Sequence, residues 1–168
     1  ETVADAKGTV KPFVFEAQKR GIIFDVGHGG GAFFWRQAIP SIQQGFKPNV
    51  ISTDLHSDSM NGGMKDMANV MSKFLNIGLT LEEVIERSTV NPANVIKRPE
   101  LGNLSVGAEA DVAVFSVKKG DFGFTDVRRY TLKGTQKMDA ELTIRAGKIV
   151  WDLNGVSGLA WDSPEALK

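Results

Sequence analysis

Both histidines of the chain follow short apolar runs that have the residue types of buried strands. His28 comes shortly after residues 22–26, and Asp54 and His56 come shortly after residues 50–53. Proteins of the α/β class place catalytic groups in this position, at the carboxyl end of a buried strand and facing a loop. Asp54 is therefore a candidate catalytic carboxylate, with the alternative that it only caps the turn that follows it.

The loop that contains His28 is rich in glycine, which suggests a possible substrate contact. Gly29, Gly30 and Gly31 follow the histidine directly, and glycine allows a ligand to approach the backbone closely. His28 could therefore contact a carbonyl or carboxylate of a substrate. The alternative is a hinge loop with a buried, hydrogen-bonded histidine. Nucleotide sites are disfavoured, because the glycines follow neither the phosphate-loop pattern with its Lys-Ser/Thr nor G-x-G-x-x-G.

The two apolar runs are separated by a helical segment, and this order predicts how the candidate residues meet. Residues 32–44 are expected to form a helix that Pro40 kinks. Strand, helix and strand in succession make a βαβ unit, whose strands are parallel. The nearly continuous apolar character of residues 22–26 predicts a strand that is covered on both faces. His28 and Asp54 should then emerge at the same edge of the sheet.

Helices are also expected before and after this unit. Pro12 and Gly21 bound a short helix. Apolar residues at helical spacing predict an amphipathic helix that ends at Gly78; they are Met64, Met67, Met71, Phe74 and Leu75. Thr80 and Glu83 have the spacing of a capping box and should open a further helix.

From about Gly102 the helical periodicity stops and short β-type runs follow. The expected short strands are residues 111–115, 130–132 and 142–144, with a tight turn at Ala146-Gly147 into a last strand. The chain therefore divides into residues 1–100 and residues 101–168, of which the second is a small β-structure.

The composition excludes several classes of protein. The 168 residues include no cysteine, so there is no disulfide framework and no thiolate metal site. Lys+Arg and Asp+Glu are equal in number, 20 each, which argues against a nucleic-acid partner. No apolar run approaches the roughly 18 residues of a membrane helix, and the amino terminus has no apolar signal sequence. We expect a cytoplasmic protein without a membrane partner, either processed or beginning inside a longer chain, since it lacks an initiator methionine.

Several motifs, taken together, carry a resemblance to a known family. They are FDVGHGGGAF at residues 24–33, ISTDLH at 51–56, MSKF at 71–74, LGNLSVGAEAD at 101–111 and IRAGKIV at 144–150. In their order and spacing they resemble the amidohydrolase superfamily, in particular its dihydroorotase-like amidohydrolases and deacetylases. The similarity extends over residues 11–151.

The resemblance implies an α/β fold in which this chain holds the last part of a larger architecture. Residues 1–100 would be the last two βα units of a TIM-type (β/α)8 barrel, and residues 101–168 part of a small β-sandwich with a carboxyl-terminal tail. By position, residues 21–28 would be the seventh barrel strand and residues 50–54 the eighth.

The resemblance also implies a metal-dependent hydrolase. Its substrate would be a small molecule with an N-acyl or cyclic amide, or an acetyl ester, and its cofactor one or two divalent metal ions, expected to be zinc. Asp54 would be a metal ligand and the general base. His28, Gly29, Gly30 and, more weakly, His56 would face the substrate.

The chain departs from the family pattern in its metal ligands. No His-x-His occurs anywhere, and two histidines cannot complete the ligand set. We therefore expect a carboxyl-terminal fragment that is inactive by itself and that associates with the missing amino-terminal part or with further copies of itself. The alternative is a catalytically inactive fragment that serves as an oligomerising structural module.

Overall fold

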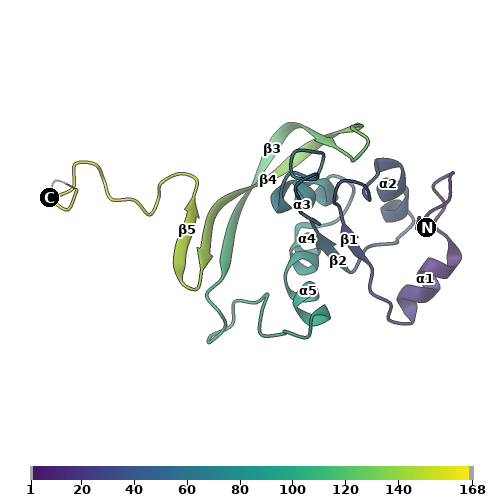
Figure 1. Cartoon of the computed structure of the whole chain (residues 1–168), viewed down its shortest axis with the longest axis horizontal. Coiled ribbons are helices and arrows are strands. Elements are labelled where there is room, and N and C mark those ends of the chain that lie inside the picture. Colours follow the sequence, from purple (N-terminus) through teal and green to yellow (C-terminus); the bar gives the residue numbers. More distant parts are fainter. Residues whose placement is uncertain (1, 167–168) are drawn as a thin grey trace.

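The computed structural model describes residues 2–166, which form helices, one pair of parallel strands and one antiparallel sheet (Figure 1). In chain order they are α1 (Pro12–Lys19), β1 (Asp25–Gly27), α2 (Trp35–Gln43), β2 (Val50–Ser52), α3 (Met67–Leu75), α4 (Leu81–Ser88), α5 (Val90–Val95), β3 (Val112–Thr125), β4 (Thr131–Arg145) and β5 (Lys148–Asp152). None of these helices has the length and apolar character needed to span a membrane.

Strands β1 and β2 are parallel and α2 connects them, as the βαβ pattern predicts. The register pairs Val26 with Ile51. The expectation that residues 22–26 form a strand covered on both faces is wrong, because β1 begins only at Asp25. Ile22 and Ile23 precede it and are 52% and 48% exposed. In the described part of the chain β1 pairs with β2 alone, so its other edge is unpaired.

Local signals fix the boundaries of the helices that follow. Asp66 caps α3 by accepting a hydrogen bond from the Asn69 amide at 2.7 Å. Met64 is therefore outside the helix, although it is fully buried as the apolar pattern predicts. The capping box at Thr80 is confirmed, since the side chains of Thr80 and Glu83 each bond the other's backbone amide.

The later part of the chain forms one antiparallel sheet in the order β3-β4-β5. The expectation of short strands is wrong, because β3 has 14 residues and β4 has 15. Strand pairing continues through stretches without an apolar pattern, where charged pairs such as Lys118 and Asp139 (2.9 Å) lie on the sheet. The tight turn into β5 is confirmed, with positive φ at Ala146 and Gly147. The described residues contain no second sheet that would complete a sandwich here.

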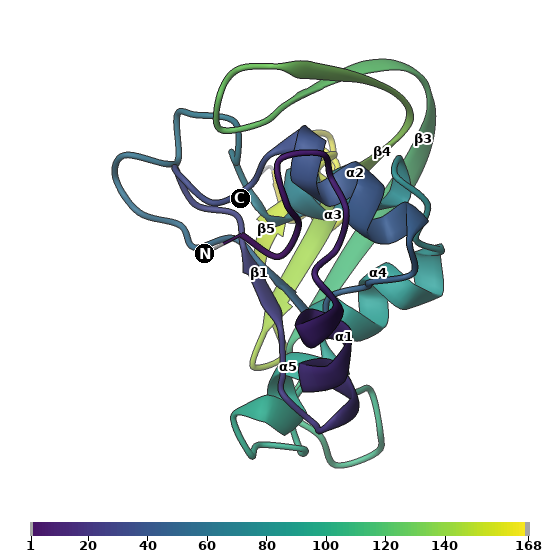
Figure 2. The ribbon, with the colours of Figure 1, turned by 90° about the vertical axis from the view of Figure 1, so that its right-hand side faces the viewer.

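The β3–β4 hairpin arches over α2 and α3 (Figure 2) and is joined to α3 by side-chain hydrogen bonds. The Met138 amide donates to Ser72 Oγ at 2.8 Å, and Asn76 Nδ2 donates to the Gln136 carbonyl at 2.7 Å. Phe124 and Met138 of the hairpin belong to the same buried apolar cluster as residues of α2 and α3. A single core therefore crosses the predicted boundary at residues 100/101.

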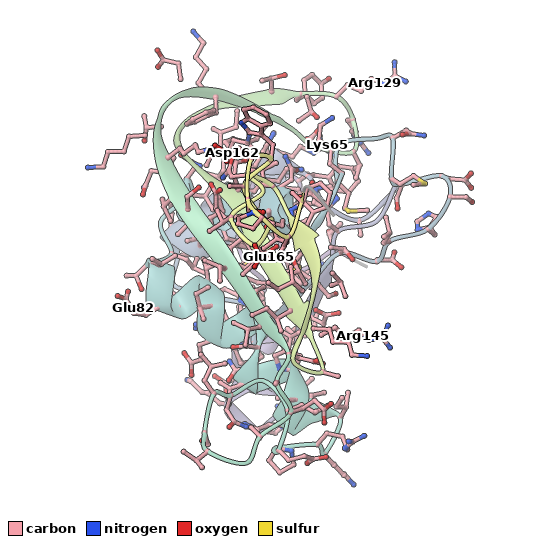
Figure 3. All side chains as sticks on the ribbon, turned by 90° about the vertical axis from the view of Figure 1, so that its left-hand side faces the viewer. Lys65, Glu82, Arg129, Arg145, Asp162 and Glu165 are labelled. Atoms are coloured by element: carbon pink, nitrogen blue, oxygen red, sulfur yellow. The ribbon has the colours of Figure 1, made fainter. Side chains whose placement is uncertain are left out.

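Most charged side chains lie on the outside of this arrangement. Figure 3 shows Glu82 of α4, Arg129 in the connection between β3 and β4, and Arg145 at the end of β4 projecting outward. Beyond β5 the chain up to residue 166 is mostly exposed and leads away from the other elements (Figure 1).

Candidate functional site

Asp54 follows β2 by two residues and presents an open carboxylate. The residue is exposed, and no described residue donates a hydrogen bond to its side-chain oxygens. Its backbone has a positive φ of 49°, a conformation that costs a non-glycine residue roughly 1–2 kcal/mol. The carboxylate does not cap the following turn, so that alternative is wrong. Ser59 closes the turn instead, by accepting from the His56 amide at 3.0 Å.

The glycine loop after β1 lies directly against this carboxylate. A Cβ atom on Gly29 would come within 2.4 Å of Asp54 Oδ2 and would displace the carboxylate, and the positive φ of 49° at this position also favours glycine. The Gly29 amide donates to the Thr53 carbonyl at 2.8 Å and holds the two strand ends together. The prediction that the ends of these strands meet is therefore confirmed.

His56 also lies beside the glycine loop. Its Nδ1 is 2.8 Å from the Asp54 carbonyl oxygen, which orients the ring. A Cβ on Gly30 would lie 3.7 Å from His56 Nε2, so the ring lies across from the glycine loop. Asp54, His56, Gly29 and Gly30 thus lie together at the ends of β1 and β2, in a group that we call the Asp54 site.

His28 takes the second of the two arrangements that the sequence leaves open. Its ring is fully buried and stacks on Phe33, with 4.5 Å between ring centroids. Nδ1 lies 3.0 Å from the Gly29 carbonyl oxygen and Nε2 lies 2.7 Å from Lys73 Nζ. Burial, and after it the nearby Lys73, lower the pKa of His28 to about 4. With this pKa the ring is neutral near pH 7. Because it is buried away from the exposed Asp54, contact between His28 and a substrate stays a prediction.

Lys73 is a residue of this region that the sequence reasoning missed. Its side chain is fully buried, and Nζ donates to the carbonyls of Gly63 (2.6 Å) and Thr125 (2.7 Å). Burial lowers the pKa of Lys73 to about 7, against the attraction of Asp126. The available signal was the lysine itself, since residues 70–75 are otherwise apolar or small.

A separate cavity of about 560 Å³ lies along β1 and α2. Its walls are mainly aromatic and aliphatic, among them Phe24, Val26, Phe33, Ile42, Phe46 and Phe74. Neither Asp54 nor His56 lines it. The cavity therefore lies at the open edge of the small parallel sheet and is separate from the Asp54 site.

The described residues fit one position of a metal site. Within residues 2–166, no three or more His, Cys, Asp or Glu side chains come together in a way that could hold a metal ion. A catalytic zinc site uses about three protein ligands. The unpartnered carboxylate of Asp54 suits one of these, and the described residues do not gather a full set of ligands around it.

Comparison with known proteins gives a consistent set of relatives. Residues 35–150 match the model of the amidohydrolase family. A deacetylase of Brucella anthropi is 39% identical over 150 residues, covering 82% of this chain and 37% of the relative. A deacetylase of Agrobacterium fabrum is 38% identical over 150 residues with the same coverage, 82% and 37%. A deacetylase of Enterococcus faecalis is 30% identical over 145 residues, covering 86% and 39%.

Two solved structures are also similar to this chain. The crystal structure of an adenine deaminase superposes with a TM-score of 0.83 at 30% identity, covering 89% of this chain and 41% of that one. The crystal structure of a dihydroorotase superposes with a TM-score of 0.76 at 33% identity, covering 84% and 39%. The chain thus spans about two fifths of the length of these relatives.

Proposed function

The chain belongs to the amidohydrolase family, and on that premise we propose that Asp54 is the proton-transferring residue of a hydrolase that removes acetyl groups from amides or esters. The observation that carries this proposal is the open carboxylate of Asp54, exposed and without a hydrogen-bond donor from the described residues. The acetyl group is favoured over a cyclic amide because three relatives are named deacetylases.

Each residue of the Asp54 site has a separate role in the proposed reaction. Asp54 accepts a proton from the attacking water and returns it to the leaving amine or alkoxide, acting first as general base and then as general acid. Gly30 is exposed, which allows a substrate to approach the backbone beside Asp54. His56 lies across from Gly30, and its ring nitrogen can form a hydrogen bond to the acyl group or to the part of the substrate next to it. Gly29 leaves space for the carboxylate because it has no side chain.

A divalent metal ion, for which zinc is our expectation, would when bound polarise the acyl carbonyl and make the water a better nucleophile near neutral pH. Asp54 would hold one coordination position. The other ligands would come from another part of the enzyme or from another polypeptide.

A second candidate function is a catalytically inactive, oligomerising module, and the strand pairing favours it for the 168-residue chain taken alone. Within the described residues β1 and β2 each pair only with the other, and the cavity of about 560 Å³ lies along β1. Unpaired strand edges beside apolar surface promote association. In this case the chain would hold no metal and would form oligomers.

Metal content and acetate release together test the proposal. The purified enzyme, complete with the polypeptide that supplies the remaining metal ligands, is dialysed exhaustively, analysed for metals and assayed for acetate released from a panel of N-acetyl and O-acetyl amino acids. Asp54→Asn should lower the rate at least about 100-fold, the usual contribution of general acid–base catalysis, and should lower metal content. Asp58→Asn, in the same exposed loop, is the control and should change neither.

Two results would go against the proposal. Full activity of Asp54→Asn would remove Asp54 from the chemistry. A protein without metal or acetate release that sediments as an oligomer would instead support the structural module.

A further inference from the structure

Lys73 is the one lysine among the buried residues of the described chain, and no carboxylate lies within salt-bridge distance of it. Burying a charged group is unfavourable unless it is well hydrogen-bonded. The buried ammonium group is therefore stabilised by neutral hydrogen-bond acceptors. The segments that supply these acceptors are the ones that Lys73 connects.

Three acceptors from three separate segments surround Lys73 Nζ. They are His28 Nε2 in the loop after β1 (2.7 Å), the Gly63 carbonyl in the loop after Asp54 (2.6 Å) and the Thr125 carbonyl at the end of β3 (2.7 Å). An ammonium group has three N–H donors, whereas a neutral amine has two. The charged form, which prevails below the Lys73 pKa of about 7, therefore satisfies this site, which we call the Lys73 junction (Lys73, His28, Gly63 and Thr125).

The junction also fixes the tautomer of His28. Because Nε2 accepts from the ammonium, the ring proton is on Nδ1, where it donates to the Gly29 carbonyl at 3.0 Å. The opposite tautomer would direct the lone pair of Nδ1 at that carbonyl oxygen. The ring orientation thus sets the position of the Gly29 peptide, which lies against the Asp54 carboxylate.

The second arm of the junction reaches the other side of Asp54. The loop that begins at Asp54 returns to the core at Gly63, whose carbonyl Lys73 binds. A Cβ on Gly63 would lie 2.6 Å from the Asp126 carbonyl oxygen, so this end of the loop is packed directly on the hairpin. A single ammonium group therefore secures both loops that frame Asp54.

From this geometry we propose that Lys73 is a positioning residue for Asp54, acting through the Gly29 and Gly63 loops without touching the reacting atoms. The inference rests on the proposed function in one respect only, namely that Asp54 transfers the proton. The arrangement of the two loops is independent of that role.

The test compares Lys73→Met with Lys133→Met, which removes an exposed lysine of β4. In Lys73→Met we expect kcat for acetate release to fall about 100-fold, as for a displaced catalytic group, with KM changed less than about threefold. Amide exchange at Gly29 should accelerate at least about tenfold, while exchange at Val84 in α4 stays unchanged. Lys133→Met should match the wild type in every measurement.

A measurement on the wild type covers the case in which Lys73→Met does not fold. Nitrogen-15 NMR of the His28 ring in the full chain should show a protonated Nδ1 and an Nε2 that accepts a hydrogen bond. A proton on Nε2, or unchanged kcat and Gly29 exchange in a folded Lys73→Met protein, would overturn the inference. Full activity of Asp54→Asn would overturn the proposed function instead, so the two failures are distinguishable.

Discussion

Mild acid should destabilise this fold through a single buried side chain, His28. Burial, and after it Lys73, lower its pKa from 6.5 to about 4 in the folded protein, while the charge of Asp126 acts in the opposite direction. Between these two pH values the unfolded chain binds a proton that the folded chain does not. The contribution of His28 is therefore complete above pH 6.5 and is lost as the pH falls toward 4.

The size of this effect follows from the same two values. Each pH unit between them is worth about 1.4 kcal/mol, so the loss amounts to about 3 kcal/mol in the free energy of unfolding. A single domain is usually stable by about 5–15 kcal/mol. The loss is thus a large fraction of the total and is readily measured.

Urea unfolding followed by tryptophan fluorescence, from about pH 7 to about pH 4, provides the assay. His28→Gln is the reference variant, since its side-chain oxygen can accept from Lys73 and does not titrate. Carboxylates titrate in both proteins, so the difference between the two isolates His28. The wild-type advantage should shrink by about 3 kcal/mol across this range. A difference that stays constant with pH would refute the reasoning.

Two further substitutions test the site and the core. Gly29→Ala should reduce acetate release at least about tenfold and destabilise the fold by about 1–2 kcal/mol, because its Cβ would meet Asp54 Oδ2 at 2.4 Å. Gly31→Ala, with nothing within 4 Å of its Cβ, should leave both quantities unchanged in the same assays. Trp35→Phe should cost about 1–3 kcal/mol in urea unfolding, since the indole N–H donates to two carbonyls of the hairpin at 3.1 and 3.0 Å. An equal loss in Trp151→Phe, whose ring is 52% exposed, would contradict this explanation.

Features of the fold that depend on local sequence were predictable. The capping box at Thr80 and the parallel pairing of residues 25–27 with 50–52 follow from spacing and element order alone. The length of β3 and β4 was not, because their pairing passes through charged residues and bulges that give no alternating pattern. The exposure of Ile22 and Ile23 depends on which strands are present beside β1, and that information is not local.

The proximity of Asp54 to the glycine loop was predictable, but the buried residues that support this arrangement were not. Asp54, His56, Gly29 and Gly30 come together because both strands are parallel and end at the same edge. Lys73 was not recognised, since residues 70–75 are all buried and helical periodicity cannot distinguish a buried lysine from an exposed one there. Its role became visible only when three distant acceptors were located around one nitrogen. The metal, the substrate and the contact to His28 stay predictions.

The core shared by α3 and the β3–β4 hairpin has a consequence for the continuity of the chain. Residues 97–110, between α5 and β3, are mostly exposed. The hydrogen bonds of Ser72 and Asn76 to β4 and the common apolar cluster hold together the parts of the chain before and after this segment. The backbone of this segment adds the close packing of Gly102 on the Thr89 carbonyl, but the apolar contact between the halves lies outside it. A protease cut after Lys97 would therefore leave a nicked, non-covalent complex, and the two halves would be suited to fragment complementation.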